Sequence, residues 1–204
     1  MDYGTWPRLF VVDVEGNGGQ PPDLVEVAAI PVVNGSPVPS FARSTLLRPP
    51  NPITPFATRV HHITNRDVAA APTWEQAGPQ VHADLEGVWI CAHAAHVDYG
   101  VLLRHMPHWK PAGVIDTLRL ARATYPKAGR YSLDALIELT AIDLASVPGQ
   151  RHRAAYDAHA TALLLIALAG HYDTWDALLA AAVPPGMPGA PQPANPECEE
   201  PTLW

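Results

Sequence analysis

The feature that most constrains this chain is the stretch from Leu9 to Gly19, in which an apolar run ends in two acids and a group of glycines. A continuous apolar run bounded by turn residues is typical of a strand that is buried on both faces of a sheet. Asp13 and Glu15 are two residues apart, so both side chains point to the same face of such a strand. Two carboxylates at a buried strand end repel each other and lose their hydration, unless they are paired or bind a cation. The stretch therefore indicates either a strand end that turns into solvent or a metal-binding pair at the edge of a sheet.

The composition is that of one globular domain. The chain has 204 residues, of which 48% are hydrophobic and 16% are charged, which is enough for a substantial core. No apolar run approaches the roughly 20 residues of a membrane span, and the N-terminus has neither the basic segment nor the apolar stretch of a signal peptide. Cys91 and Cys198 lie far apart, which argues against a disulfide framework and favours a reducing environment. We therefore expect a cytoplasmic protein that does not contact membranes.

The formal net charge of −7 at pH 7 at first argues against a polyanionic partner. Three of the acids, Glu197, Glu199 and Glu200, lie close to the C-terminus, and without these three charges the rest of the chain carries −4. Divalent cations held by carboxylates of the body would bring it close to neutral. Charge therefore does not exclude a nucleic acid, but it disfavours a long, non-specific grip on a duplex.

Strand and helix patterns alternate along the chain. Apolar and β-branched runs predict five strands, at residues 8–14, 23–33, 41–47, 88–91 and 113–116. Periodic and capping patterns predict helices at residues 73–86, 98–105, 117–122, 133–139, 152–169 and 172–182. A three-stranded meander followed by alternating strands and helices predicts an α/β fold, in which helices cover both faces of a mixed five-stranded sheet.

The composition changes at Pro184. Seven of the last 21 residues are proline, and glycine, alanine and one glutamine are among the others. Such a segment cannot bury a core and is typical of a flexible, partly extended tail. We expect a folded domain over residues 1–183 and a Pro-rich disordered tail over residues 184–204.

Three further residues are candidate partners of Asp13 and Glu15. Asp98 follows the fourth predicted strand and opens a helix, whose N-terminus suits anions and metal-bound phosphate. His152 stands at or just before the start of the long helix, and Asp157 follows about a turn and a half later. Asp157 would point inward from an otherwise apolar helix face, which is an unusual place for a free carboxylate.

In this order and on these elements, the residues resemble the motif of the DEDD exonuclease superfamily in its histidine-containing branch, DEDDh. All five motif positions are filled, by Asp13, Glu15, Asp98, His152 and Asp157. The spacing is similar to that of bacterial exonuclease X and of the proofreading (epsilon) subunit of replicative polymerases. The resemblance implies an RNase H-like three-layer α/β/α fold and an exonuclease domain over residues 1–183, with its core at about residues 8–170.

Two further stretches extend the resemblance. Residues 60–64 (VHHIT) are similar to the family's His-x-Ile-Thr loop, and residues 131–136 (YSLDAL) are similar to its Ser-Leu-x-x-Leu helix start. Many members have Asn where this chain has Ala94 and Phe where it has Val97, which leaves the substrate preference open. The resemblance implies that the substrate is contacted by Gly16, Asn17, His61, His62, Ile63 and Thr64.

The resemblance also implies phosphodiester hydrolysis with two divalent cations, Mg²⁺ or Mn²⁺. Hard carboxylate ligands suit these ions better than Zn²⁺, which prefers Cys and His. It implies that His152 accepts the proton of the attacking water near neutral pH. It implies as metal ligands the four acids Asp13, Glu15, Asp98 and Asp157.

The expected function is a metal-dependent 3′–5′ exonuclease that releases 5′-mononucleotides from single-stranded or frayed DNA 3′ ends, in DNA repair or proofreading. One alternative is a 3′–5′ exoribonuclease that trims RNA ends, because the 2′-hydroxyl is read by only a few local contacts. Another is a non-catalytic polymerase-accessory or end-binding module with the same fold. The complete motif argues against such a module, because binding alone does not need His152.

The end of the chain, from Glu200 to Trp204, resembles the short peptides by which bacterial replication proteins dock on the sliding clamp. Leu203 and Trp204 would fill an apolar pocket, although Glu200 stands where such peptides carry Gln. An aromatic anchor on a flexible tether suits docking, because the tether raises the effective concentration at the bound partner. The alternative is a tail end that binds nothing.

Overall fold

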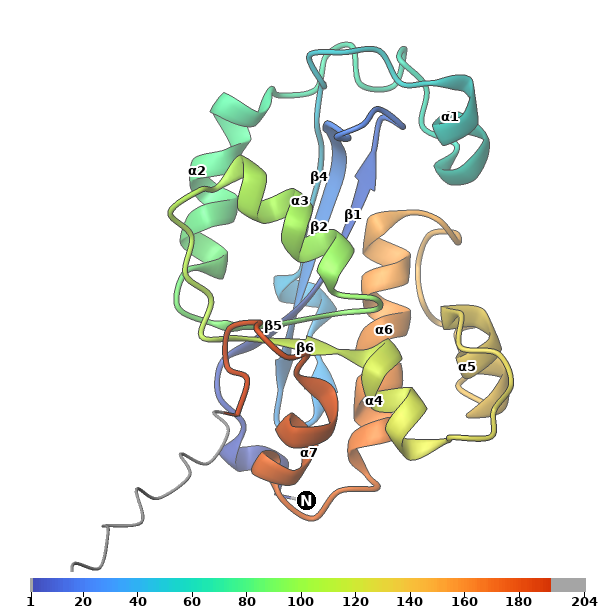
Figure 1. Ribbon diagram of the computed structural model, residues 1–204. Coiled ribbons are helices and arrows are strands. Elements are labelled where there is room, and N and C mark those ends of the chain that lie inside the picture. The colour runs from blue at the N-terminus through green and yellow to red at the C-terminus, as the bar shows by residue number, and fades with distance from the viewer. Residues whose placement is uncertain (1, 192–204) are drawn as a thin grey trace, which may run out of the picture.

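The computed structural model describes residues 2–191, and Figure 1 shows a central sheet with helices on both sides of it. The strands are β1 (Leu9–Gly16), β2 (Leu24–Val33), β3 (Ser36–Pro37), β4 (Arg43–Leu46), β5 (Trp89–Ala92) and β6 (Gly113–Asp116). The helices are α1 (Pro55–His61), α2 (Trp74–Leu85), α3 (His96–His105), α4 (Thr117–Thr124), α5 (Leu133–Leu139), α6 (Ala154–Ala169) and α7 (Trp175–Ala182), with two short 3-10 helices at Tyr3–Thr5 and Pro39–Phe41. None of the helices within residues 2–191 is long and apolar enough to cross a membrane.

β1 is the central strand of the sheet. It pairs antiparallel with β2 on one side and parallel with β5 on the other, and β6 continues the sheet in parallel beyond β5. On its far side β2 also pairs with β3 and β4. The carboxyl ends of β1, β5 and β6 therefore meet at one edge of the sheet, the kind of edge at which open α/β sheets bind their ligands.

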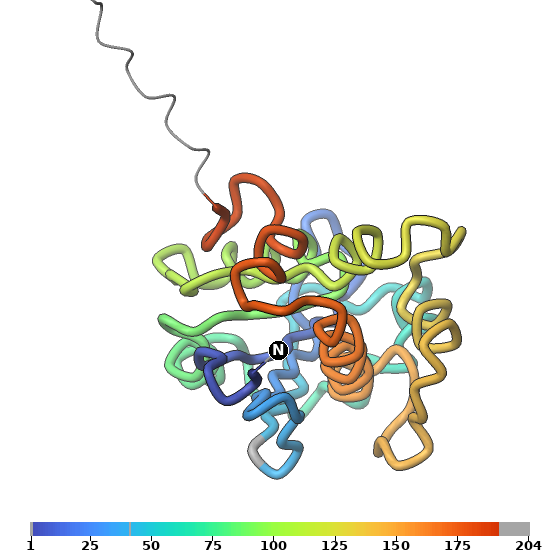
Figure 2. The backbone as a smooth tube through the Cα atoms, turned by 90° about the horizontal axis from the view of Figure 1, so that it is seen from below, coloured from blue at the N-terminus to red at the C-terminus, as the bar shows by residue number. Residues whose placement is uncertain are grey.

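Alternating side chains of β1 serve two separate cores. Val11 packs in the core that α4, α5, α6 and α7 cover, whereas Val12 packs in the core that α2 and α3 cover. In Figure 2 the blue first strand lies between the green segment that carries α2 and the orange helix α6. Because residues two apart share a face of a strand, Asp13 and Glu15 lie on the same side as Val11 and face α6.

The secondary structure differs from the prediction in two places. The sheet has six strands instead of five, because β3 is a two-residue strand, too short to produce a sequence period. It follows a turn at Asn34 and Gly35, whose φ angles of 50° and 72° suit a tight hairpin. α1 occupies a stretch for which the sequence pattern predicts neither a helix nor a strand, and it begins with Thr54 as its N-cap and Pro55 in its first turn.

The first residues of the Pro-rich segment are packed on the fold. The carbonyl of Pro188 accepts a hydrogen bond of 3.0 Å from the backbone N–H of Val114 on β6. Met187 packs against the core under α2 and α3. The described structure thus continues past residue 183, where the tail was expected to begin. Residues 192–204, and with them Leu203 and Trp204, lie outside the described residues.

Candidate active site

The carboxyl end of β1 and the first turn of α6 bring three carboxylates together. Asp13 and Glu15 face α6 from β1, and Asp157 lies in the first turn of that helix. One carboxylate oxygen from each of the three lies within 4.8 Å of the other two, and no other group of His, Cys, Asp or Glu side chains within residues 2–191 is clustered in this way. Such a set of oxygen ligands fits a hard divalent cation such as Mg²⁺ or Mn²⁺.

Asp98 reaches the same strand end from the first turn of α3. Only 5% of the residue is exposed. Its Oδ1 accepts a hydrogen bond of 3.0 Å from the backbone N–H of Val14, the residue between Asp13 and Glu15. Asp98 is not one of the three acids whose oxygens are mutually close, but its charge raises the pKa of Asp13. All four predicted metal ligands therefore converge on one end of β1.

Burial and mutual repulsion make these carboxyl groups hard to ionise. Burial is the largest cause that raises the pKa of Asp13 well above its ordinary value, followed by repulsion from Asp98, Glu15 and Asp157. The pKa of Glu15 is raised to about 8, first by burial and then by repulsion from Asp157. Burial also raises the pKa of Asp98 to about 7. Among residues 2–191 neither Asp13 nor Glu15 forms an ion pair with Lys or Arg, so a bound cation is what would favour their charged forms.

His152 lies on the solvent side of the cluster, two residues before α6. Its backbone has a φ of 59°, a left-handed conformation that is uncommon for residues other than glycine. Its backbone N–H donates a hydrogen bond of 3.1 Å to Oδ2 of Asp157, and its ring Nδ1 lies 4.0 Å from the same oxygen. The side chain is 46% exposed. The imidazole is thus held beside a carboxylate of the cluster while it stays open to water, which suits a group that exchanges protons.

Two residues that the sequence did not single out hold the start of α6 against the sheet. Glu26 on β2 is 3% exposed and lies directly across from Glu15. Arg153 donates to both oxygens of Glu26, from Nε to Oε2 and from Nη2 to Oε1, at 2.9 Å each. The backbone N–H of Ala154 donates to Oε2 of Glu26 at 3.1 Å, so this carboxylate also caps the helix that carries Asp157. The sequence signal that could have revealed Glu26 was an acid inside a run of Val, Ala and Ile.

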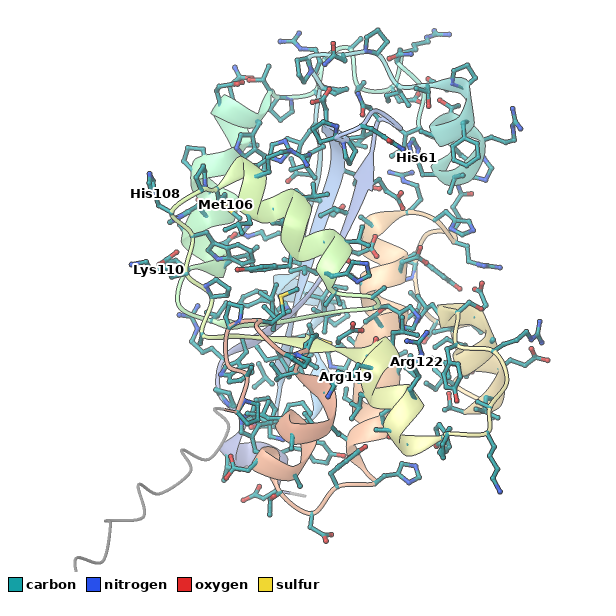
Figure 3. The ribbon with its side chains drawn as sticks, in the orientation of Figure 1. His61, Met106, His108, Lys110, Arg119 and Arg122 are labelled. Carbon is teal, nitrogen blue, oxygen red and sulfur yellow. The ribbon has the colours of Figure 1, made fainter. Side chains whose placement is uncertain are left out.

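Two of the predicted substrate contacts are engaged within the protein. Asn17 is 2% exposed, and its Oδ1 accepts hydrogen bonds of 2.9 Å from two backbone N–H groups of the β1–β2 loop. Nδ1 of His61 accepts a hydrogen bond of 3.0 Å from Ile63, and its Nε2 donates at 3.2 Å to the carbonyl of Gly16. Figure 3 shows His61 close to the end of β1. These bonds favour a role for Asn17 and His61 in shaping the loops, not in contacting a substrate.

The exposed side chains of the predicted substrate loop are His62 and Thr64. His62 ends α1 with a φ of 63°, which turns the chain. The hydroxyl of Thr64 donates to Asp67 at 2.7 Å, and the Ile63 side chain is buried. Of the residues that the resemblance assigns to the substrate, His62, Thr64 and the backbone at Gly16 therefore remain available at the surface.

A hydrogen-bonded set joins the start of α3 to the start of α4. Oδ1 of Asp116 accepts from the backbone N–H of Ala94, just before α3, and from N–H groups in the first turn of α4. The ring of His93 bonds the first residue of α4 and, at 2.9 Å, the carbonyl of Tyr131. His93 thus shapes the loop before Asp98, and both helices start at the same edge of the sheet.

Comparison with known proteins identifies the family. The model of the RNase_T exonuclease family matches residues 10–165, a span that contains all five motif residues. The chain belongs to this exonuclease family. The expectation of an enzyme, a nuclease with the RNase H-like α/β fold of DEDD exonucleases, is therefore confirmed.

Individual members of the family are similar over most of this chain. Exodeoxyribonuclease 10 of Escherichia coli (strain K12) is 36% identical over 159 residues, which cover 78% of this chain and 67% of that protein. The 3′-5′ exonuclease DinG of Bacillus subtilis is 28% identical over 166 residues, 78% of this chain but 17% of that protein. The solved structure of exonuclease X in complex with 5′ overhanging duplex DNA has a TM-score of 0.71 and 33% identity, and the match covers 83% of this chain and 96% of that chain.

Proposed function

We propose that this exonuclease removes nucleotides from the 3′ ends of DNA in a reaction that needs a divalent cation, Mg²⁺ or Mn²⁺. The observation that carries the proposal is the cluster of Asp13, Glu15 and Asp157, whose oxygens lie within 4.8 Å of one another in a chain of the exonuclease family. Asp13 and Glu15 form no ion pair among residues 2–191, and the ion pair of Asp157 is with the exposed His152 at 4.0 Å, so a bound cation would offset the cost of burying these carboxylates together.

The residues have separate tasks in this reaction. Asp13, Glu15, Asp98 and Asp157 would hold two divalent ions, which when bound neutralise the scissile phosphate, activate water and stabilise the leaving oxygen. His152 accepts the proton of the attacking water on the solvent side, where its ring is exposed. The bond from the His152 backbone to Asp157 keeps the imidazole beside the cluster. Attack on the terminal phosphodiester from this side releases a 5′-mononucleotide.

The substrate that we propose is single-stranded DNA or a frayed DNA end, in the context of repair or proofreading. The similarity to an exodeoxyribonuclease and to exonuclease X bound to overhanging DNA supports DNA. The name of the DinG relative supports the 3′–5′ direction. The acidic charge of the chain disfavours a long grip on a duplex. An exoribonuclease would need a contact to the 2′-hydroxyl, so an RNA strand is the comparison to make.

The direct test is degradation of 5′-labelled single-stranded DNA, duplex DNA with a 3′ overhang, and RNA, each with Mg²⁺, Mn²⁺ or EDTA. We expect a ladder that shortens from the 3′ end on single-stranded DNA with either metal, and no reaction in EDTA. A 3′-terminal phosphate should block the reaction. Early release of the labelled 5′ nucleotide would contradict the polarity, full activity in EDTA would contradict the metal, and faster loss of RNA would contradict the substrate.

We also propose, from the sequence of residues 200–204, that Leu203 and Trp204 dock on the bacterial sliding clamp inside the cytoplasm. Such a tether would help an exonuclease that binds DNA weakly, because it keeps the enzyme near primer ends. The test is fluorescence polarisation of a labelled peptide of residues 195–204 with purified clamp. Binding that is lost in Leu203→Ala and Trp204→Ala is expected, and binding that both substitutions leave unchanged would refute the docking.

A further inference from the structure

A groove between α4 and α7 carries two arginines that the proposed reaction has not used. The groove encloses about 600 Å³, with Arg119 and Arg122 of α4 on one wall. It is also lined by small side chains, Ala123 of α4 and Ala180 and Ala181 of α7. Figure 3 shows both arginines on α4. The groove is therefore lined by two positively charged side chains of one helix and by small side chains of its neighbour.

Arg119 and Arg122 differ from three other arginines of the same half of the chain. Arg130 and Arg151 pair with carboxylates of α5, and Arg153 pairs with Glu26. Arg119 and Arg122 are exposed, and within residues 2–191 neither forms an ion pair. Two uncommitted guanidinium groups on one helix face, in a protein of net charge −7, leave donors free for an anionic ligand.

The side chains around these arginines keep the groove receptive to anions. The guanidinium carbon of Arg122 lies 5.6 Å from the centre of the Tyr131 ring, a stacking contact that restrains the side chain but leaves its N–H groups free. Asp116 is the acid that lines the groove, and its Oδ1 accepts from the backbone N–H groups of Ala94, Leu118 and Arg119. These three bonds partly offset the negative charge of Asp116, so repulsion of an incoming phosphate is reduced.

The sheet places the groove close to the carboxylate cluster. β1, β5 and β6 are parallel neighbours, and α4 starts directly after β6. Adjacent strands are about 4.8 Å apart. Asp116 pairs with Ala92, and Cys91 pairs with Val11, so the end of β6 lies about 10 Å across the sheet from Val12, the residue before Asp13. A single strand bound at the end of β1 would span this distance within a few nucleotides.

The groove also lies on the side from which an incoming strand would arrive. α1, which precedes the exposed His62 and Thr64, packs against Val25 of β2, on one side of β1. β6 and α4 lie on the other side of β1. Figure 1 shows α1 and α4 on opposite sides of the end of α6 that carries the cluster. If the terminal nucleoside lies beside α1, the strand that leads to it must cross towards α4.

We propose that Arg119 and Arg122 bind backbone phosphates of the substrate strand upstream of the scissile bond, which is the 5′ side. The inference rests on the proposed function, because it needs the scissile phosphate at Asp13 and a 3′ end beside α1. Each guanidinium offers a fork of donors that matches phosphate oxygens. Phosphate contacts position a strand without reading its sequence, so the groove would raise affinity for strands that are long enough to reach it.

The test compares the wild-type protein with Arg119→Gln/Arg122→Gln on a dinucleotide and on an oligothymidylate of about ten nucleotides. The double substitution should raise KM for the longer strand about tenfold or more, leave kcat unchanged, and leave the reaction on the dinucleotide unchanged. The plot of log affinity against log salt should become shallower by about 1.4 units, because two phosphate contacts are lost from a single strand.

The matched control is Arg8→Gln/Lys110→Gln, which removes the same two charges. Arg8 and Lys110 are exposed and precede β1 and β6, so they lie at the opposite edge of the sheet, and neither forms an ion pair among the described residues. An equal rise of KM in this control would show a general effect of net charge and would overturn the proposal that the two arginines of the groove bind phosphates. An equal loss on the dinucleotide would place the arginines in the chemistry and also overturn it.

Fluorescence polarisation of the labelled oligothymidylate in EDTA separates the two proposals. If the wild-type protein cleaves neither DNA nor RNA, the proposed function fails. If the wild-type protein cleaves single-stranded DNA but the Arg119→Gln/Arg122→Gln variant binds the oligothymidylate as tightly as the wild type does, only the proposal that the two arginines bind phosphates is refuted. Thermal melts of both double variants should match the wild type, since exposed arginines without ion pairs contribute little to stability.

Discussion

Glu15 and Glu26 lie directly across from each other on neighbouring strands, yet the two carboxylates differ in their hydrogen-bond and ion-pair partners. Glu26 is satisfied: Arg153 donates to both of its oxygens and the backbone of Ala154 donates to one of them. Glu15 forms no ion pair among residues 2–191, and its pKa is raised to about 8 by burial and by Asp157. Arg153 lies close enough to lower the pKa of Glu15, but only as the smallest of its influences.

The difference separates a structural carboxylate from a carboxylate that serves a ligand. A buried acid that only stabilises a fold needs its partner from the protein itself, as Glu26 has. An acid that will bind a metal must keep its oxygens free, so without a metal the acids at the end of β1 either carry charge without a partner or hold a proton. At Asp13 and Glu15 the carboxylates that serve the function lower the stability of the metal-free protein. At Glu26 the same hydrogen bonds serve both, because they stabilise the fold and also fix the helix that carries Asp157.

The largest expected effect comes from Asp13→Asn. Exonuclease activity should fall below detection, because one carboxylate of the cation-binding set is lost at nearly constant shape. The melting temperature of the metal-free protein should rise, since the substitution removes a carboxyl group whose charge is opposed by burial and repulsion. Nuclease assays and thermal melts in EDTA measure the two effects. A lower melting temperature together with lost activity would show that Asp13 supports the fold instead of opposing it.

A smaller loss is expected for His152→Ala, because His152 supplies proton transfer and not metal binding. The rate should fall about 10²–10⁴-fold, the usual contribution of a general acid or base. Metal affinity, measured by calorimetry, should stay close to that of the wild type, because the side chain lies 4.0 Å from Asp157 on its solvent side. Near-normal turnover at pH 7 would mean that another group accepts the proton.

The third effect is on stability and compares the paired residues directly. Glu26→Gln leaves Arg153 without its charge partner and should cost about 2 kcal/mol of unfolding free energy, a value reduced because Arg153 is 32% exposed. Glu15→Gln, across the same strand pair, should leave the metal-free protein at least as stable as the wild type. Urea unfolding in EDTA measures both. If Glu15→Gln were the more destabilising of the two, the distinction between the two glutamates would be lost.

Three of the five motif residues are conspicuous in the sequence because each breaks a local rule. Asp13 and Glu15 end an apolar strand, and Asp157 stands on an apolar helix face, so each is conspicuous in the sequence alone. Glu26 breaks the same rule inside an apolar run. Its partner Arg153 could not be predicted, because it is 127 residues away in the sequence and meets Glu26 only when α6 lies on the sheet.

The contacts within the loops depend on tertiary packing more than the strands do. Asn17 and His61 were assigned to the substrate through the resemblance, but their hydrogen bonds depend on how the β1–β2 loop and α1 pack together. α1 and β3 are short, so hydrophobic periodicity gives little signal for either. The position of residues 184–191 on β6 depends on a backbone bond between Pro188 and Val114, which composition cannot indicate.

The last effect is spread over several pH units and is a change of stability with pH in the metal-free protein. The pKa of Glu15 is about 8 in the folded protein and about 4.5 in the unfolded chain, so between these values the folded state holds a proton that the unfolded chain releases. Stability should therefore fall as pH rises through this window, by at most about 1.4 kcal/mol per pH unit for this group, and level off above pH 8.

Buried histidines change the stability with pH in the opposite direction. The control must therefore separate their contribution from that of Glu15. Burial lowers the pKa of His61, His93 and His159, so the unfolded chain binds their protons more readily and stability rises with pH until about 6.5. Unfolding free energies of the wild type and of Glu15→Gln in EDTA, measured from pH 5 to 9, cancel this contribution in their difference. The difference should grow in favour of Glu15→Gln from pH 5 to 8. A constant difference would mean that Glu15 is compensated in the folded protein as well as Glu26 is, and the contrast between the two carboxylates would then not rest on charge.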